Sequence, residues 1–306
     1  MADINRTTNS MALPSDISSE ILQKTQAESA IMRLARQIEL PGRGVTIPVI
    51  TGDPTAAWVA ETGVKPVSNG TPGTKLMQAF KIAVIETFSK EFVRDIPALY
   101  DALVQRLPGA LAGVFDSTIV GATQAPSQSN FDTFANCTAQ SILNANNGTY
   151  LGLVAADADV AAHGGVMNGL AFAAQGRALL LTATDTTNRP LFLASAADGV
   201  VDKVLGVPTY FNKNLYKAGT AAAGQTAGTP AIVGVAGDWT QAMYGTVAGV
   251  EISVTETASL TVGSGNNATT INLWQQNMIG VRAEIEVGFR ADTSCFNLLT
   301  GAVPTT

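Results

Sequence analysis

Residues 95–120 read DIPALYDALVQRLPGALAGVFDSTIV, and the rest of the chain is organised around this stretch. Its apolar side chains recur at steps of three and four, which is the period of one helical face. Asp95 is a suitable N-cap, and Pro97 falls in the first turn, where a missing N–H costs nothing. One such helix would be about 40 Å long, although the expected radius of gyration of the chain is only about 19 Å. Pro108 and Gly109 predict a kink or a break near its middle.

The composition narrows the class of protein. Of the 306 residues 46% are hydrophobic and only 14% are charged, so we expect some apolar surface to face partner molecules. The net charge is −6 without any run of Lys or Arg, which argues against tight direct binding of nucleic acid. The polar N-terminus and the lack of a long apolar run predict neither a secretory signal nor a membrane span. The two distant cysteines, Cys137 and Cys295, fit the reducing environment of a cytoplasm.

Residues 42–89 form the most unusual region of the sequence. Val45, Ile47 and Val49 recur at every second position, a Gly-, Pro- and Thr-rich passage carries Trp58, and 65–74 have turn chemistry. A second alternating leg runs over 80–88. Two legs of about fifteen residues would make a ribbon roughly 50 Å long. Because an isolated hairpin is marginal in water, we predict an arm that lies on a neighbouring copy.

The clearest strand covers residues 279–289, where apolar residues alternate with glycines and charges of both signs. Residues 251–262 are its expected antiparallel partner, and we expect this sheet to pack on the long helix. Between the long helix and these strands, over residues 130–249, the pattern is α/β. The remaining predicted elements are helices at 14–26, 30–38, 134–144 and 157–175, and strands at 178–182, 190–193, 207–211 and 231–235.

The residues of an enzyme active site are not evident. His163 is the only histidine, and neither a nucleophile elbow nor a carboxylate signature accompanies it. Residues 70–75 superficially suggest a phosphate loop, but the last glycine is not adjacent to the lysine. With one histidine and two distant cysteines a zinc site is not expected. We therefore predict no catalytic, cofactor-binding or metal-binding residues, no cofactor and no enzymatic activity.

The predicted arm and the charged face of the C-terminal strand supply the candidate contact residues. Glu61, Arg282 and Glu284 are expected to form ion pairs between subunits. A covalent alternative is an isopeptide bond from Lys65 or Lys75 to Asn297, if a nearby carboxylate moves the proton. Solvated lysines and a turn asparagine are the competing interpretation. The candidates for contacts between subunits are Trp58, Glu61, Lys65, Lys75, Arg282 and Glu284.

Short motifs follow one another in a recognisable order over nearly the whole chain. They are LPSDI at 13–17, the passage from IPV to AWVAE at 47–61, FSKEFVRD at 88–95, FD at 115–116, NRPL at 188–191, LGVP at 205–208, GDW at 237–239 and QNMIGVRAE at 276–284. None is diagnostic alone. Their order and spacing resemble the major capsid proteins of tailed bacteriophages, whose fold is named after a Hong Kong lambdoid phage.

This resemblance implies an α+β phage major capsid fold with five parts. These are an N-terminal arm (1–41), an extended loop in the form of a β-hairpin arm (42–89), a spine helix of the peripheral domain (90–129), an α/β axial domain (130–249), and peripheral-domain strands with the C-terminus (250–306). It also implies self-assembly into the hexamers and pentamers of an icosahedral virion shell, built in the cytoplasm of a bacterial host around a double-stranded DNA genome.

The resemblance implies partners as well. A portal protein is expected. Because little sequence precedes the first predicted helix, we also expect either a separately encoded scaffolding protein or assembly without one. A cement or decoration protein is a further candidate, whereas no membrane partner is expected. Two alternatives stay open at this point: the shell of an encapsulin-type nanocompartment, and a monomeric surface-binding or hydrolytic α/β protein.

Overall fold

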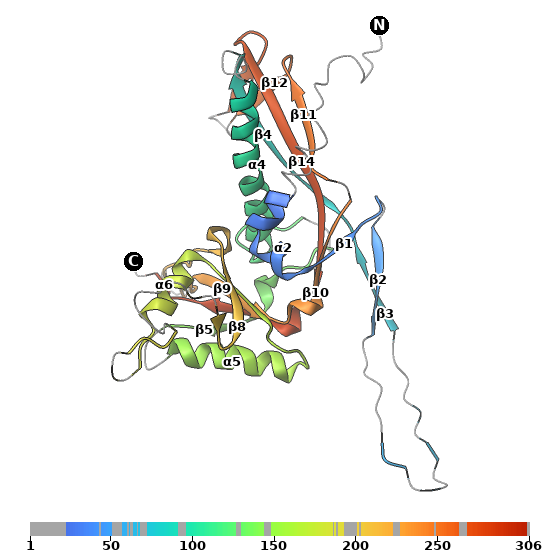
Figure 1. The fold of residues 1–306 in the computed structure, drawn as a ribbon, viewed down its shortest axis with the longest axis vertical. Helices are drawn as coiled ribbons and strands as arrows, with labels where there is room; N and C mark the ends of the chain where they lie inside the picture. Colours follow the sequence, from blue (N-terminus) through green and yellow to red (C-terminus); the bar gives the residue numbers. More distant parts are fainter. Residues whose placement is uncertain are drawn as a thin grey trace.

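The structure is a computed structural model of the chain. It describes residues 23–42, 44–50, 57–59, 61, 64–65, 67, 72–90, 96–126, 130–143, 148–185, 187, 189–192, 201, 203–222, 227–247, 249–262 and 268–304. A long helix and a five-stranded sheet form an elongated upper part, and a six-stranded sheet with two helices forms a lower part (Figure 1). A two-stranded hairpin projects from the side of this body (Figure 1).

The long helix is α4, Ile96–Ile119, with 24 residues. The helical prediction is confirmed, and the helix runs through Pro108 without the break that the sequence left open. Proline removes one intrahelical hydrogen bond and crowds the preceding turn. Here the side chains of Leu107, just before Pro108, and of Leu111 and Phe115, after it, are almost fully buried. We infer that their burial outweighs the local cost of the proline.

The five-stranded sheet is built around β14 (Met278–Ala291). On one side β14 pairs with β4 (Phe80–Ser89), and on the other side with β11 (Glu251–Thr255) and β10 (Ala242–Thr246). β1 (Arg36–Glu39) adds to β10 in parallel. Leu107 and Leu111 of α4 share a buried cluster with apolar residues of β14, as expected from the sequence.

The predicted partner of the C-terminal strand is confirmed only in part. Residues 251–255 pair with β14 as expected. Residues 259–262 form β12 (Ser259–Val262), which instead pairs with β13 (Thr269–Asn272) in a separate hairpin.

The six-stranded sheet has the order β5-β15-β9-β6-β8-β7. Leu153, Ala156 and Leu180 of the helices α5 and α6 belong to one buried cluster, so both helices cover the same face of this sheet. The elements are β5 (Thr138–Ser141), α5 (Gly148–Ala162), β6 (Gly169–Phe172), α6 (Ala174–Thr182), β7 (Lys203–Val204), β8 (Val207–Phe211), β9 (Ile232–Gly237) and β15 (Phe296–Thr300). The described residues also form short 3₁₀ turns, which are η1 (Phe134–Asn136), η3 (Lys213–Leu215), η4 (Trp239–Gln241) and η6 (Thr293–Cys295).

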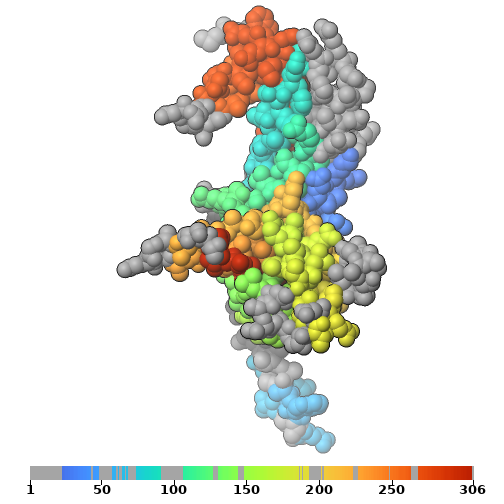
Figure 2. Space-filling model, turned by 90° about the vertical axis from the view of Figure 1, so that its left-hand side faces the viewer, coloured from blue at the N-terminus to red at the C-terminus, as the bar shows by residue number. Residues whose placement is uncertain are grey.

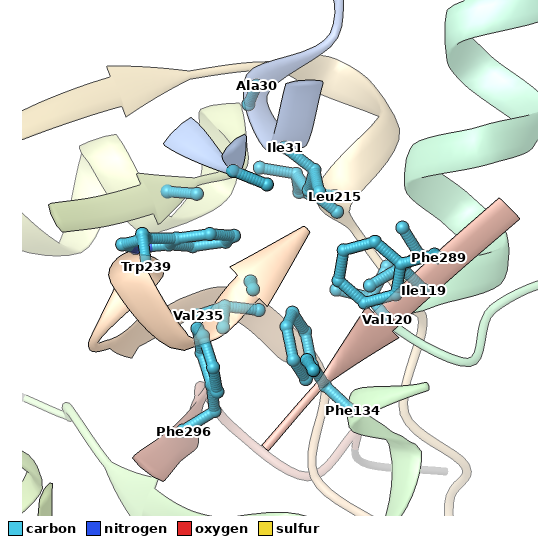
Figure 3. Close-up of a cluster of buried hydrophobic side chains, with 14 of the residues drawn as sticks. Ala30, Ile31, Ile119, Val120, Phe134, Leu215, Val235, Trp239, Phe289 and Phe296 are labelled. Atoms are coloured by element: carbon cyan, nitrogen blue, oxygen red, sulfur yellow. The ribbon is translucent and has the colours of Figure 1, made fainter. Parts of the chain in front are cut away.

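An aromatic cluster joins the two parts of the body. Phe134 stacks on Phe296 with 4.4 Å between the ring centroids and meets Phe289 edge-on at 5.7 Å (Figure 3). Phe289 belongs to the five-stranded sheet and Phe296 to the six-stranded sheet. Ile31 of the short helix α2 (Ala30–Leu34) is buried in the same cluster. Both sheets therefore share one core.

Several predictions in the α/β region are wrong. Residues 134–144 contain η1 and β5 instead of a helix, and 178–182 lie in α6 instead of a strand. The helix predicted at 157–175 is α5, which begins at Gly148 and ends before Gly164, where φ is +79°. Short apolar runs cannot be assigned to helix or strand by periodicity alone, which explains these errors. The strands predicted at 207–211 and 231–235 are confirmed as β8 and β9.

Two predicted N-terminal helices have different outcomes. The helix predicted at 30–38 ends at Leu34, and the chain then continues as β1. Most of 14–26 lies outside the described residues, although 23–26 are helical. Of the strand predicted at 190–193, the structure describes 190–192, where Pro190 forms an isolated bridge with Thr184.

The predicted arm is shorter than expected, because its second leg was misassigned. Its hairpin consists of β2 (Val45–Ile50) and β3 (Pro72–Met77). β4 carries the alternating pattern of the second leg but pairs with β14 in the body. The pattern identified the strand correctly, whereas its pairing partner lies about two hundred residues away in sequence, beyond the range of local periodicity.

The sheets also cross the boundaries of the predicted regions. β10 lies within 130–249 but pairs in the five-stranded sheet, and β15 lies within 250–306 but pairs in the six-stranded sheet. β14 and β15 are consecutive strands joined only through η6, so the chain passes directly from one sheet to the other. None of the helices in the described part of the chain has the length and hydrophobicity needed to span a lipid bilayer.

Candidate assembly interface

The hairpin of β2 and β3, with the described residues between them, is called the arm below. β2 and β3 pair from Val45 and Met77 at the body to Ile50 and Pro72 at the outer end. The described residues of 57–67 lie beyond this outer end, away from both sheets (Figures 1 and 2). The arm therefore carries its far end into solvent in the isolated subunit.

The far end of the arm exposes large apolar side chains. Trp58 is 105% exposed, Val64 96% and Val67 88%. Single exposed apolar residues are ordinary, but several together on a projecting segment indicate a contact surface. Glu61 and Lys65 are exposed on the same segment. Three of the residues predicted to contact a neighbour, Trp58, Glu61 and Lys65, are thus accessible.

The body carries apolar surface as well. A groove of about 460 Å³ lies between β4 and the C-terminal part of α4. Val114 of α4 is 44% exposed at this groove. The other apolar residues that line it include Phe80, Ile82, Phe115, Pro126 and Phe131.

The structure brings two of the predicted charged residues together within one chain. Arg282 Nε lies 3.1 Å from Glu284 Oε1, and Lys81 Nζ lies 2.9 Å from Glu284 Oε2. The hydrogen bond with Glu284 raises the pKa of Lys81. Glu61 belongs to the arm and is exposed. Ion pairs of these residues between subunits stay a prediction. Glu284 already has two cationic partners, Lys81 and Arg282, in its own chain.

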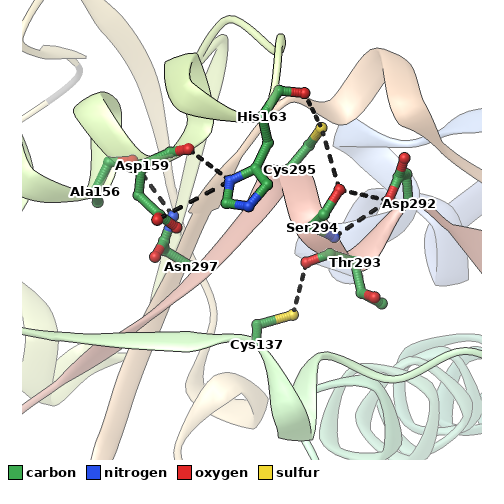
Figure 4. A network of polar contacts seen from close by, with 9 residues as sticks. All are labelled: Cys137, Ala156, Asp159, His163, Asp292, Thr293, Ser294, Cys295 and Asn297. Carbon is green, nitrogen blue, oxygen red and sulfur yellow. Dashed lines mark hydrogen bonds and ion pairs between the residues drawn. The ribbon is translucent and has the colours of Figure 1, made fainter.

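The residues of the predicted isopeptide bond are not together in the subunit. Asn297 is fully buried on β15, where its Nδ2 donates to the carbonyl oxygen of Ala156 at 3.3 Å (Figure 4). Lys75 lies on β3 and donates to the carbonyl oxygen of Ala291 at 3.2 Å. Lys65 is at the far end of the arm. The cross-link stays a prediction, which a buried asparagine does not favour.

The histidine and the cysteines occupy ordinary structural positions. His163 Nδ1 lies 2.8 Å from the carbonyl oxygen of Asp159 (Figure 4). Burial raises the pKa of Cys137 to about 12 and also raises the pKa of Cys295, so both thiols are protonated at neutral pH. Within the part of the chain that the structure describes, no group of three His, Cys, Asp or Glu side chains is arranged to hold a metal ion.

One buried carboxyl group was missed by the sequence analysis. Asp116 of α4 accepts hydrogen bonds from Ser29 Oγ at 2.5 Å, from the N–H of Ala30 at 3.1 Å and from Asn212 Nδ2 at 2.8 Å. It therefore ties the long helix to the N-terminal segment and to η3 of the lower part. Burial, opposed by hydrogen bonds from Ser29 and from the N–H groups of Ala30 and Ile31, raises the pKa of Asp116 to about 7. A lone aspartate in an apolar helix end was the only signal, because its partners are far away in sequence.

The sequence of the chain matches a known family. The sequence pattern of the phage capsid family matches residues 9–293. The probable major capsid protein gp17 of Mycobacterium phage L5 is 28% identical over 294 residues, covering 89% of this chain and 84% of that protein. The major capsid protein of Staphylococcus phage 80alpha is 25% identical over 297 residues, covering 95% of this chain and 85% of that protein.

Solved structures share the fold. A chain from Gordonia phage Cozz has a TM-score of 0.66 at 21% identity, covering 90% of this chain and 87% of that one. A chain from Microbacterium phage Oxtober96 has a TM-score of 0.67 at 19% identity, covering 99% and 96%. A capsid chain of a native GTA particle has a TM-score of 0.58 at 14% identity, covering 99% and 96%. The predicted α+β capsid fold is confirmed, and the match over most of its length shows that the chain belongs to the phage capsid family.

Proposed function

We propose that this chain is the major capsid protein of a tailed phage, and that its copies associate as the hexamers and pentamers of an icosahedral shell around a double-stranded DNA genome. The observation that carries the proposal is the arm. Trp58, Val64 and Val67, at the far end of an extended hairpin, are almost fully exposed in their own subunit. Membership of the phage capsid family supports a neighbouring copy as the partner.

The mechanism of such a subunit is mechanical instead of catalytic. Each arm laid on a neighbour adds a contact that the isolated subunit lacks, and obligate interfaces of several thousand Å² per subunit are the expected scale. In this proposal 1–41 serve as the N-terminal arm, and 42–89 contain the extended loop followed by β4, which pairs with β14. Residues 90–129 and 250–306 form the peripheral domain, and 130–249 form the axial domain. The crossing strands β10 and β15 would then couple the last two domains.

The charge of the chain supports a container that holds DNA without gripping it. The net charge is −6, so a packaged polyanion finds little counterion release on this protein as a whole. A portal protein, a separate scaffolding protein and a decoration protein are proposed partners that accompany this role. Assembly in the host cytoplasm belongs to the same proposal.

Electron microscopy of the purified protein tests the proposal directly. After expression in a bacterium we expect closed shells of uniform curvature, or hexamers and pentamers that close into shells when a scaffolding protein is co-expressed. A protein that stays monomeric in size exclusion at high concentration under both conditions would contradict the proposal. Shells isolated from infected cells should contain DNA, whereas an enzyme cargo would identify a nanocompartment instead.

Replacement of Trp58 by alanine is expected to weaken assembly without affecting the fold. Burial of a large apolar side chain contributes about 2 kcal/mol, so its loss should raise the threshold concentration for assembly about thirtyfold. The melting temperature of the subunit should not change, because Trp58 is fully exposed there. Light scattering against concentration measures the threshold. Trp58→Phe, which keeps an aromatic ring, is the matched control and should assemble nearly as the wild type does.

A further inference from the structure

The root of the arm is packed tightly against β14. Met77, the last residue of β3, is 0% exposed. A Cβ atom added to Gly288 would lie 2.4 Å from the carbonyl oxygen of Gln78 and 3.0 Å from Cγ of Met77. Real side chains do not approach so closely, so only glycine fits at this position of β14. The arm therefore begins at a tightly packed contact with β14.

Two polar contacts flank this root. Lys75 Nζ on β3 donates to the carbonyl oxygen of Ala291 at 3.2 Å. Asn130 Nδ2 donates to Gln78 Oε1 at 2.7 Å. One contact thus holds the arm itself, and the other holds the residue that follows it. The side chains of Lys75, Gln78 and Asn130 are all partly buried.

A third set of contacts holds the groups to which the root is bound. Asp132 follows Asn130 by two residues in the loop before η1, and it accepts from Arg290 Nη1 at 2.9 Å and from the N–H of Ala291 at 3.1 Å. Ala291 therefore binds Asp132 through its N–H and Lys75 through its carbonyl group. Arg290 and Asp132 are only 11% and 20% exposed, so solvent screens this pair less than it would a surface pair.

Ala291 lies at the junction between the two sheets. It is the last residue of β14, and the chain then passes through η6 to β15 in the other sheet. The contacts around Ala291 are thus placed where the chain leaves one sheet for the other. Phe131 packs in the same place, with its ring centroid 5.9 Å from that of Phe80 and 6.1 Å from that of Phe289.

We propose that Lys75, Gln78, Asn130, Asp132 and Arg290 form a clamp that sets the direction in which the arm leaves the body, and that the clamp ties this direction to the junction of the two sheets. The proposal rests on the proposed function of the arm in assembly and deepens it. Lys75 is then a positioning residue for the contact with the neighbouring subunit, and it acts within its own chain.

Because the arm is long, a small rotation at its root would displace its far end by several ångströms. Residue 67 lies ten residues before Met77 in sequence, and a fully extended chain of that length reaches roughly 30 Å. A rotation of about 10° at the root would move the far end by about 5 Å, more than the distance over which apolar side chains stay in contact. In a ring of identical subunits the same error recurs at each interface, and the ring then fails to close.

Substitution of Lys75 tests the clamp. Lys75→Met keeps the aliphatic stem and removes the donor, whereas Lys75→Arg keeps a donor. We expect Lys75→Met to melt as the wild type does, yet to need about tenfold more protein for assembly, as expected for the loss of one charge-assisted hydrogen bond. Its shells should also vary more in diameter under the electron microscope. Lys75→Arg should restore both properties, and Lys203→Met, the same change at an exposed site of β7, should have no effect.

The direction of the arm is measured in the unassembled subunit. Nitroxide labels on Lys65→Cys and Lys203→Cys, with Cys137 and Cys295 replaced by alanine, give a distance distribution by electron paramagnetic resonance. The distribution should be narrow with Lys75 and broad with Lys75→Met. If Lys75→Met destabilises the fold, Asn130→Ala removes a contact from the other side of the clamp and is measured in its place.

The outcomes separate the clamp from the proposed function. Equal distance distributions and equal shells for the wild type and the clamp variant would overturn the clamp while leaving the shell function intact. A wild type that never assembles would overturn the proposed function, and the distance distributions would still decide whether the clamp orients the arm.

Discussion

A subunit in which residues 51–71 are replaced by an Asn-Gly turn is expected to fold and to lose assembly. β2 and β3 remain, and their outermost pair, Ile50 with Pro72, can be closed by a two-residue turn. The variant loses Trp58, Val64 and Val67 from the arm. If burial on a neighbour contributes about 2 kcal/mol for each, the threshold concentration for assembly should rise by more than about a thousandfold, beyond the range in which shells form.

Size exclusion and negative-stain microscopy measure this loss. The matched control shortens a different loop: residues 221–228 are replaced by the same turn between Thr220 and Thr229, which pair in an isolated bridge. That variant should still form shells. Normal shells from the variant without 51–71 would contradict the proposal that the arm holds neighbouring subunits together.

Asp116 gives the second large expected effect, which is a dependence of stability on pH. Burial raises the pKa of Asp116 from 3.8 to about 7 in the native state. Between these values the unfolded chain releases a proton that the native state retains, so the contribution of Asp116 to stability falls as pH rises. It is fully present below about pH 4 and lost as pH rises through 7. A difference of about three in pKa corresponds to about 4 kcal/mol in the free energy of unfolding.

Asp116→Asn removes this titration and keeps the size of the side chain. Relative to this variant, the unassembled wild type should lose about 4 kcal/mol between pH 4 and pH 8 in urea denaturation. The same substitution at the exposed Asp157 of α5 is the control and should reproduce the wild-type dependence. Parallel pH profiles for the wild type and Asp116→Asn would show that the buried carboxyl group is not the cause.

The residues of the candidate interface could be predicted only in part from the sequence. Trp58, Glu61 and Lys65 were found because an apolar or charged side chain in a turn-rich, alternating region is visible in a short window. Lys75 was assigned to contacts with a neighbour, although it binds Ala291 in its own chain. Asn297 was expected just beyond a terminal strand, yet it lies on β15 in the core. Each error concerns a partner more than a hundred residues away.

The sequence by itself determined the long helix and the central strand β14, because helical and strand periodicities are local properties of the chain. The α+β class was implied by the resemblance of its motifs to the phage capsid family. Only the tertiary structure decided that β4 leaves the arm to pair with β14, and that β15 returns to the other sheet. The same holds for the carboxyl group of Asp116 and for the clamp around Ala291. Strand pairing and buried hydrogen bonds join groups that are distant in sequence, so their partners depend on how the whole chain packs and not on any local pattern.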